Sequence, residues 1–166
     1  MAITKVTSDL LNSTALTSKA FGTSSIMIGD DATGTIDAAN YNVGLGVDVF
    51  AALTTGDENV AVGFASLNVN STGHKNTAVG AYALDANTTA ANNTAIGYLS
   101  LSANTTGTQN TAVGRSSLLL NTTASNNTAV GFFASYSNTT GAQNTSLGHN
   151  ALYGTTTGSD NTGLGQ

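Results

Sequence analysis

A glycine recurs with a 17-residue period through most of this 166-residue chain, and this period limits the possible folds more than any other feature. Each of these glycines follows Val, Ile or Leu, and no insertion or deletion interrupts the series. The series consists of Gly29, Gly46, Gly63, Gly80, Gly97, Gly114, Gly131, Gly148 and Gly165. The unit reads N-T-A-V-G-x-x-A/S-L-x-x-N-T-T-G-x-x, most clearly from Asn76 to Asn92. It is too short for solenoids built from helix pairs, whose repeats run about 33–47 residues.

The residue types of the unit predict an all-β chain, because Asn, Thr and Gly favour turns and strands over helix. Each unit has room for two short strands and two turns, which is one coil of a parallel β-roll or β-solenoid. Equivalent positions of successive coils would then stack about 4.8 Å apart. We expect nine such coils in a repeat domain over residues 25–166, preceded by an N-terminal arm over residues 1–24.

Two columns of apolar residues are the predicted core. The residue before each glycine is Val, Ile or Leu in every unit, and the residue four positions after it is Leu in most units, with Ser135 among the exceptions. The residue two before the first column lies on the same side of an extended strand. It changes from Val60 in an early unit to Thr77 and later threonines. We interpret it as a half-buried inward position; the alternative is that these threonines face solvent.

Small residues occupy the other side of the same strand. An exposed face has no reason to stay small along a whole rod, whereas Gly and Ala allow another backbone to approach closely. We therefore predict that this face packs against copies of the chain in a homotrimer. The alternative is that small residues fill a narrow space inside the solenoid of one chain. The residues concerned, called the alanine column below, are Ala61, Ala78, Ala95, Ala112 and Ala129.

An asparagine stands four positions before the glycine in eight of the nine units, as at Asn76 and Asn93. Asn bonds its own turn through its side chain and tolerates left-handed backbone angles. Stacked coils would align these side chains into an amide ladder along the rod.

The composition excludes several functions. Four Lys or Arg against nine Asp or Glu cannot neutralise many phosphates, so we expect no nucleic-acid partner. The chain lacks Cys, which excludes a thiolate metal site, and no apolar run reaches the length needed for membrane insertion. His74 and His149 occupy different positions of the repeat, and the spacing of the acidic residues fits no calcium loop. We expect no enzymatic activity, catalytic residue, metal or cofactor.

The two residues after each glycine vary while the rest of the unit is fixed. Two interpretations stay open. Outward aromatic rings offer stacking surfaces and hydroxyls for contact with a receptor or a glycan, and the same rings would also pack between neighbouring chains of the trimer. The candidate contact residues are Phe64, Tyr82, Tyr98, Arg115, Phe132 and His149.

The motifs N-T-A-V-G, N-T-A-I-G and N-T-S-L-G, followed by an A-L step, resemble the head repeats of trimeric autotransporter adhesins (YadA-like heads) over roughly residues 25–166. The same pattern is similar to repeats of bacteriophage tail-fibre and head-fibre proteins. The resemblance implies a trimeric, left-handed parallel β-roll that serves as a surface fibre. The start of the chain does not look like a secretory signal, and no stalk or membrane anchor is evident. We therefore expect a virion fibre, made in the host cytoplasm, that acts in assembly and host attachment.

Two other functions stay open: the head of a bacterial surface adhesin and, more distantly, an ice-binding β-solenoid suggested by the threonine columns. In a virion, the arm would dock on another virion protein through Leu10, Leu11, Leu16 and Phe21, although it could equally cap the open end of the roll. The last coil ends inside a repeat, and we expect it to stack on a further virion protein or fibre segment.

Overall fold

The computed structural model of the chain describes residues 17–19, 26–29 and 39–165, and these residues carry ten short β-strands. The strands are β1 (Thr17–Lys19), β2 (Ile26–Gly29), β3 (Val43–Leu45), β4 (Val60–Val62), β5 (Thr77–Val79), β6 (Thr94–Ile96), β7 (Thr111–Val113), β8 (Thr128–Val130), β9 (Thr145–Leu147) and β10 (Thr162–Leu164). The arm residues Leu10, Leu11, Leu16 and Phe21 lie outside the described residues, so their docking role stays a prediction.

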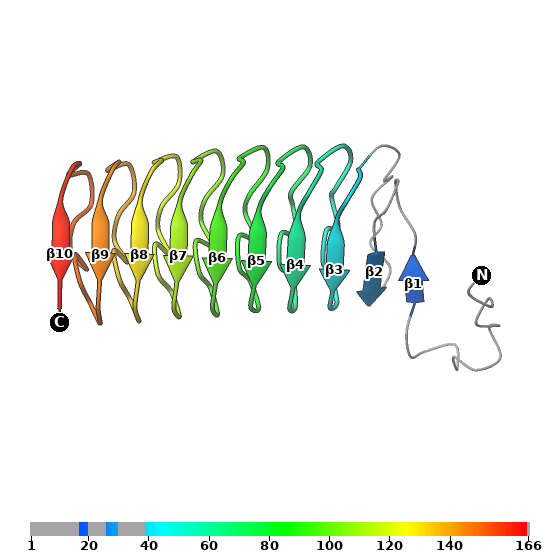
Figure 1. The fold of residues 1–166 in the computed structure, drawn as a ribbon, viewed down its shortest axis with the longest axis horizontal. Helices are drawn as coiled ribbons and strands as arrows, with labels where there is room; N and C mark the ends of the chain where they lie inside the picture. Colours follow the sequence, from blue (N-terminus) through cyan, green and yellow to red (C-terminus); the bar gives the residue numbers. More distant parts are fainter. Residues whose placement is uncertain (1–16, 20–25, 30–38, 166) are drawn as a thin grey trace.

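The strands lie side by side in chain order and form one sheet along a rod (Figure 1). β1 pairs antiparallel with β2, and each later pair is parallel, with equivalent residues opposite each other, as in Thr94 and Thr111. The eight strands from β3 to β10 repeat every 17 residues and complete about seven turns of an all-β parallel solenoid, as the period predicted. β2 also pairs parallel with β3, but residues 30–38 are not described, so the ninth coil stays a prediction.

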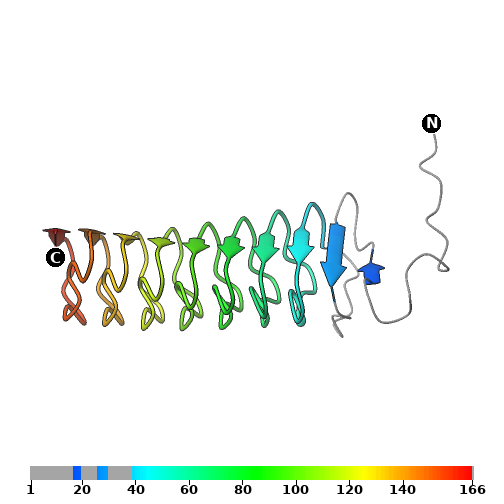
Figure 2. The same cartoon turned by 90° about the horizontal axis from the view of Figure 1, so that it is seen from below.

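Each coil contains one strand, not the two that we expected. Strands run along one side of the rod and turns along the other (Figure 2). In the segment after the glycine every second residue has a positive φ, for example 57° at Tyr82 and 51° at Leu84, which no extended strand allows. Hydrogen bonds still join the coils there: the Tyr82 N–H donates to the Phe64 carbonyl of the preceding coil and the Leu84 N–H to the Ser100 carbonyl of the next.

The recurring glycine is required by both conformation and space. Gly97 has a φ of 132°, and a Cβ on it would lie 2.6 Å from the carbonyl oxygen of Gly114 in the next coil. The same close approach recurs at the equivalent glycines from Gly46 to Gly148. A side chain here would force neighbouring coils apart. Glycine is therefore required at this position in each of these coils, and its spacing shows the repeat period.

The leucine column predicted as core is indeed buried, with no exposed surface at Leu67, Leu84, Leu101 and Leu118. The prediction for the strand is wrong, however, because the two faces are exchanged. All five residues of the alanine column have no exposed surface within the single chain, whereas Ile96, before its glycine, is 40% exposed. The threonines two positions earlier are half-buried or exposed and share this outward side.

The exchange follows from the narrow interior. The alanine side of the strand faces the leucine column at close range: even a Cβ on Gly163, the equivalent position in the last coil, would lie 2.6 Å from the Leu152 Cγ. Only a very small residue fits between the strand and that leucine. Ala61, Ala78, Ala95, Ala112 and Ala129 therefore cannot contact another chain, and the alternative of a narrow interior is confirmed.

Two buried asparagine ladders complete the interior. In the first, which the sequence predicted, the Asn76 N–H donates to the Asn59 Oδ1 (3.0 Å) and the Asn76 Nδ2 to the Ala90 carbonyl (2.9 Å). The second is formed by the first residue of each N-T-T turn: the Asn104 Nδ2 donates to the Asn87 Oδ1 (3.2 Å) and to the Gly107 carbonyl (2.9 Å). Both ladders bond neighbouring coils together from inside.

Candidate binding surfaces

An apolar stripe runs along the outer face of the sheet over all eight strands from β3 to β10. It arises because the residue before each glycine points away from the alanine column and because parallel pairing places equivalent side chains next to each other. Exposure reaches 48% at Leu45, 51% at Leu147 and 74% at Leu164. We call this surface the valine stripe. It consists of the residues before the glycines, together with Val43 and Val60 two positions earlier in the first two of these coils: Val43, Leu45, Val60, Val62, Val79, Ile96, Val113, Val130, Leu147 and Leu164.

A second feature, the aromatic row, follows the turns at the carboxyl ends of the strands. It begins with Phe64, whose ring centroid lies 5.3 Å from that of Tyr82, and continues to Tyr98 at 6.3 Å from Tyr82. Further along, the Phe132 ring stacks on His149 at 5.3 Å with an interplanar angle of 8°. The row is therefore held together by ring contacts between successive coils.

Arg115 bridges the two parts of the row. Its guanidinium carbon lies 5.8 Å from the ring centroid of Tyr98 and 5.6 Å from that of Phe132. The side chain is exposed and takes part in no hydrogen bond or ion pair within the described part of the chain. The structure thus brings together all six residues that the sequence singled out as candidate contacts; which partner they meet stays a prediction.

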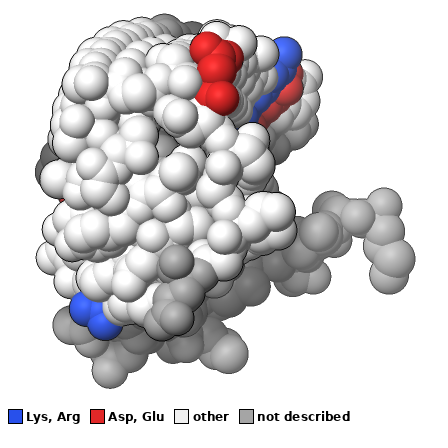
Figure 3. All heavy atoms as spheres, turned by 90° about the vertical axis from the view of Figure 1, so that its left-hand side faces the viewer, with Lys and Arg blue, Asp and Glu red and all other residues white. Residues whose placement is uncertain are grey.

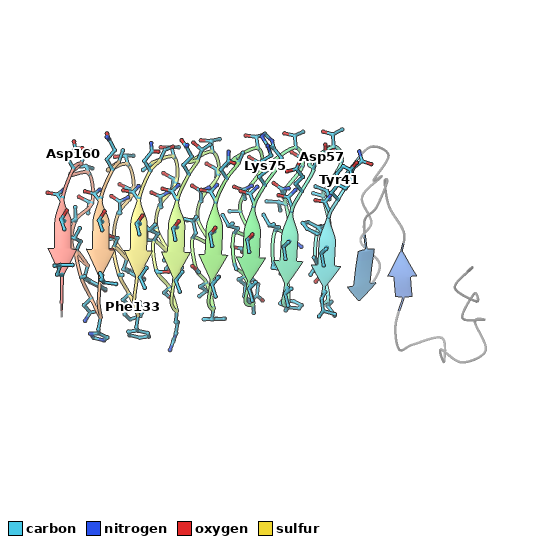
Figure 4. All side chains as sticks on the ribbon, viewed as in Figure 1. Tyr41, Asp57, Lys75, Phe133 and Asp160 are labelled. Carbon is cyan, nitrogen blue, oxygen red and sulfur yellow. The ribbon has the colours of Figure 1, made fainter. Side chains whose placement is uncertain are left out.

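A cluster of aromatic residues lies at the C-terminal end of the row. Its Phe133 is one of the two variable residues after a glycine, whereas its two tyrosines were missed from sequence. Phe133 contacts Tyr136 at 5.0 Å and Tyr153 at 6.0 Å, and the two tyrosines stack at 5.1 Å. Figure 4 places Phe133 at the edge of the rod where the strands end. Tyr136 and Tyr153 are one repeat apart, at the same position after their glycines, so the period of the sequence could have revealed the stack.

The charged residues labelled in Figure 4, Asp57, Lys75 and Asp160, lie at the opposite edge of the rod, where the strands begin. Seen along its axis from the C-terminal end, the rod shows few charged side chains (Figure 3). The Asp85 carboxylate accepts a hydrogen bond from the Ser102 hydroxyl (2.6 Å), and partial burial raises its pKa despite this bond. Charge is therefore sparse on the rod and uneven around it.

The described residues contain no group of three His, Asp or Glu side chains arranged to hold a metal ion. Within the same residues there is also no helix long and apolar enough to cross a membrane. The valine stripe and the aromatic row are the two extended surface features of the described rod.

Comparison with protein-family models, with curated proteins and with solved structures finds no match for this chain.

Proposed function

We propose that the chain is a structural fibre protein of a virion, a bacteriophage tail or head fibre, that assembles as a homotrimer and contributes to host attachment. The observation that carries the proposal is the valine stripe, an apolar surface that continues over eight successive strands of a rod. Extended apolar patches on soluble proteins mark sites of association.

A second copy of the chain is the partner that fits the stripe best. The stripe presents at least one apolar side chain per coil, and a parallel copy offers the same spacing, so the two match along their whole length. Closed rotational symmetry buries the same patch on every copy. Three copies around one axis would bring all stripes to the centre of the fibre and leave the turns outside, as the resemblance to trimeric heads implies. The trimer contact thus moves from the alanine column to the valine stripe.

The virion setting rests on the resemblance to phage fibre repeats together with the rod shape and its sparse charge. In this setting one end of the rod attaches to the particle through the N-terminal arm, and the last coil meets a further virion protein or fibre segment. The aromatic row would then lie along the outside of the fibre, available for a host-surface receptor or glycan.

Light scattering coupled to size-exclusion chromatography tests the assembly. One chain has a mass of 16.5 kDa, and a trimer is expected at three times that mass. Ile96→Glu places a charge in the valine stripe and should yield folded monomer at micromolar concentration. Its control is Thr106→Glu in the same coil, an exposed residue of the N-T-T turn, which should leave the trimer intact. A wild-type chain that is a folded monomer at high concentration would refute the trimer.

Electron microscopy of particles from the source, labelled with an antibody against the repeat domain, tests the setting. Label on tails or capsids is the expected result. Label on the cell envelope instead would overturn the virion setting and favour the head of a bacterial surface adhesin.

The outward threonine column supports a second candidate function. Six successive coils place a threonine on the outer face beside the stripe, in register, and regular threonine rows on a flat sheet are the kind of surface that binds ice. Thermal hysteresis of the purified chain measures this. Hysteresis that Thr111→Leu and Thr128→Leu abolish would favour ice binding, and none at millimolar concentration would eliminate it.

A further inference from the structure

We propose that Arg115, held between the rings of Tyr98 and Phe132, is an anion-recognition site, and that its ligand is an acidic saccharide bearing carboxylate or phosphate groups. The inference rests on the proposed attachment function and names the class of molecule to which the fibre attaches. It goes beyond the sequence prediction, which left receptor, glycan and chain packing open.

The charge distribution isolates Arg115. Between residues 86 and 159 the sequence contains no Asp, Glu or Lys and no second Arg. The nearest acids along the chain are Asp85 and Asp160, and Asp85 lies two coils before Arg115, roughly 10 Å along the rod at about 4.8 Å per coil. That separation is about one Debye length at 0.1 M salt. Among residues 39–165, therefore, no acidic side chain neutralises the positive charge of Arg115.

The geometry holds the guanidinium without using its hydrogen-bond donors. Cation–π contacts with Tyr98 and Phe132 restrain the side chain from both sides along the rod, at 5.8 and 5.6 Å. Its N–H groups meet no acceptor within the described residues. A planar guanidinium with free donors matches carboxylate and phosphate groups through two parallel hydrogen bonds. Because the two ring contacts restrict the side chain, less conformational entropy is lost when an anion binds.

The surroundings favour a saccharide over other anions. Tyr98 is 46% exposed and Phe132 is 36% exposed, so apolar ring surface flanks the cation on both sides. Sugar rings combine C–H groups that pack against aromatic side chains with hydroxyls that hydrogen-bond to neutral polar groups, and the exposed side chain of Tyr98 carries such a group beside the cation. Single-stranded nucleic acid also stacks on aromatic rings, but it requires many cations along its path, and this edge provides one.

Binding of purified protein to defined polymers tests the proposal. The probes are polygalacturonate (carboxylated), phosphomannan (phosphorylated), neutral dextran and polyglutamate, with affinity measured by calorimetry. Binding to polygalacturonate or phosphomannan, but not to dextran, is the expected result. Arg115→Gln should weaken it at least about tenfold, the usual loss for a hydrogen bond between charged groups. Arg115→Lys should weaken it several-fold, because an ammonium cannot form the paired bonds.

The matched control is Lys75→Gln, which removes the other cation of residues 39–165, at the opposite edge of the rod, and should leave affinity within twofold. Equal affinity of wild type and Arg115→Gln, or no binding to either acidic polysaccharide, would overturn the proposal. Polyglutamate binding as tight as polysaccharide binding would also overturn it, because the site would then recognise charge alone.

Mass measurements on the same samples separate this inference from the proposed assembly. If the chain is a trimer that binds neither acidic polysaccharide, the proposed fibre assembly is supported and the Arg115 site is refuted. If it is a monomer whose binding depends on Arg115, the site is supported and the trimer is refuted.

Discussion

The middle coils of the rod and its last two coils follow the same repeat unit, but different side chains fill the interior of the rod in the two regions. In the middle, Leu84, Leu101 and Leu118 are fully buried beneath the alanine column. Toward the C-terminal end, Ser135 takes the place of the leucine and Ser146 that of the alanine, and the Ser135 hydroxyl donates to the Ser146 Oγ (2.9 Å). The hydrophobic contact of the middle coils is replaced by one buried hydrogen bond.

The second asparagine ladder also ends in this region. Asn104 Oδ1 accepts from Asn121 Nδ2 at 3.0 Å, but position 155 is Thr, and the Asn138 Oδ1 is left without a hydrogen-bond partner. On the outside, Tyr136 and Tyr153 stack instead of the Asp85–Ser102 pair that occupies the same position in the middle. In a solenoid each side chain meets its equivalent in the next coil, so one substitution affects the bonding of two coils.

The largest effect is expected at the recurring glycine. Gly97→Ala should destabilise the middle coils by at least about 4 kcal/mol, because an unfavourable φ and a clash with the Gly114 carbonyl act together. Urea denaturation followed by circular dichroism measures the change. The control is Gly154→Ala in the last coils, where nothing lies within 4 Å of the new Cβ, and the change should stay within about 0.5 kcal/mol. Similar losses in both variants would show that spacing between coils does not require glycine.

The leucine column should show the difference between the two regions directly. Leu101→Ala is expected to cost about 3 kcal/mol in the free energy of unfolding, the usual result of a cavity at a fully buried leucine. Ser135→Ala, at the equivalent position, should cost no more than about 1.5 kcal/mol, the net contribution of one hydrogen bond.

Restoring the middle arrangement near the C-terminal end sharpens the same test. Ser135→Leu combined with Ser146→Ala should raise stability, and the pair should gain more than the sum of the single variants because the two side chains contact each other. A double-mutant cycle in urea measures the coupling. Additive or destabilising results would mean that the last coils have no room for the leucine.

A smaller effect is expected in the asparagine ladder. Asn104→Ala should cost about 2 kcal/mol, since it removes two hydrogen bonds of Asn104 and the acceptor of Asn121. Thr155→Asn should instead add about 1 kcal/mol by supplying a partner for the Asn138 Oδ1. Thermal unfolding of both variants, compared with wild type, checks the opposite signs; equal signs would contradict the continuity of the ladder.

The smallest effect is a pH dependence confined to the middle coils. Partial burial raises the pKa of Asp85 above its ordinary value of 3.8, so the folded chain binds this proton more tightly than the unfolded chain does. The stability contributed by the protonated carboxyl is complete below 3.8 and is lost as the pH rises through the raised pKa. Relative to wild type, Asp85→Asn should therefore gain stability as the pH rises over this window. Parallel urea midpoints for the two proteins from pH 3 to pH 7 would contradict the assignment.

Several parts of the fold were predictable because they depend on neighbours at a fixed sequence distance. Gly97, Asn76 and Leu101 each meet their equivalents one repeat away, so their roles follow from the period and from residue chemistry. The absence of a second strand was not predictable in this way, because positive φ at residues such as Leu84 contradicts the usual preference of leucine.

The candidate contact residues were found because they vary within a fixed frame, but their arrangement was not. That Arg115 lies between Tyr98 and Phe132 depends on the stacking of neighbouring turns and on side-chain direction. The residues of the valine stripe were predicted from sequence to face the core. A regular alternation of residues along a strand separates its two faces but does not show which of them is buried.

The sequence by itself determined that this chain is a β-solenoid with one coil per repeat unit, because equivalent residues must stack and only some residue types tolerate that contact. Only the tertiary structure decided which face of each strand is inside. The alternation of side chains along a strand defines its two faces. Which face is buried depends on how much space lies between the strand and the turn opposite it. Here the leucine column leaves room for a methyl group at most, so alanine is buried and valine lies on the outer face of the sheet.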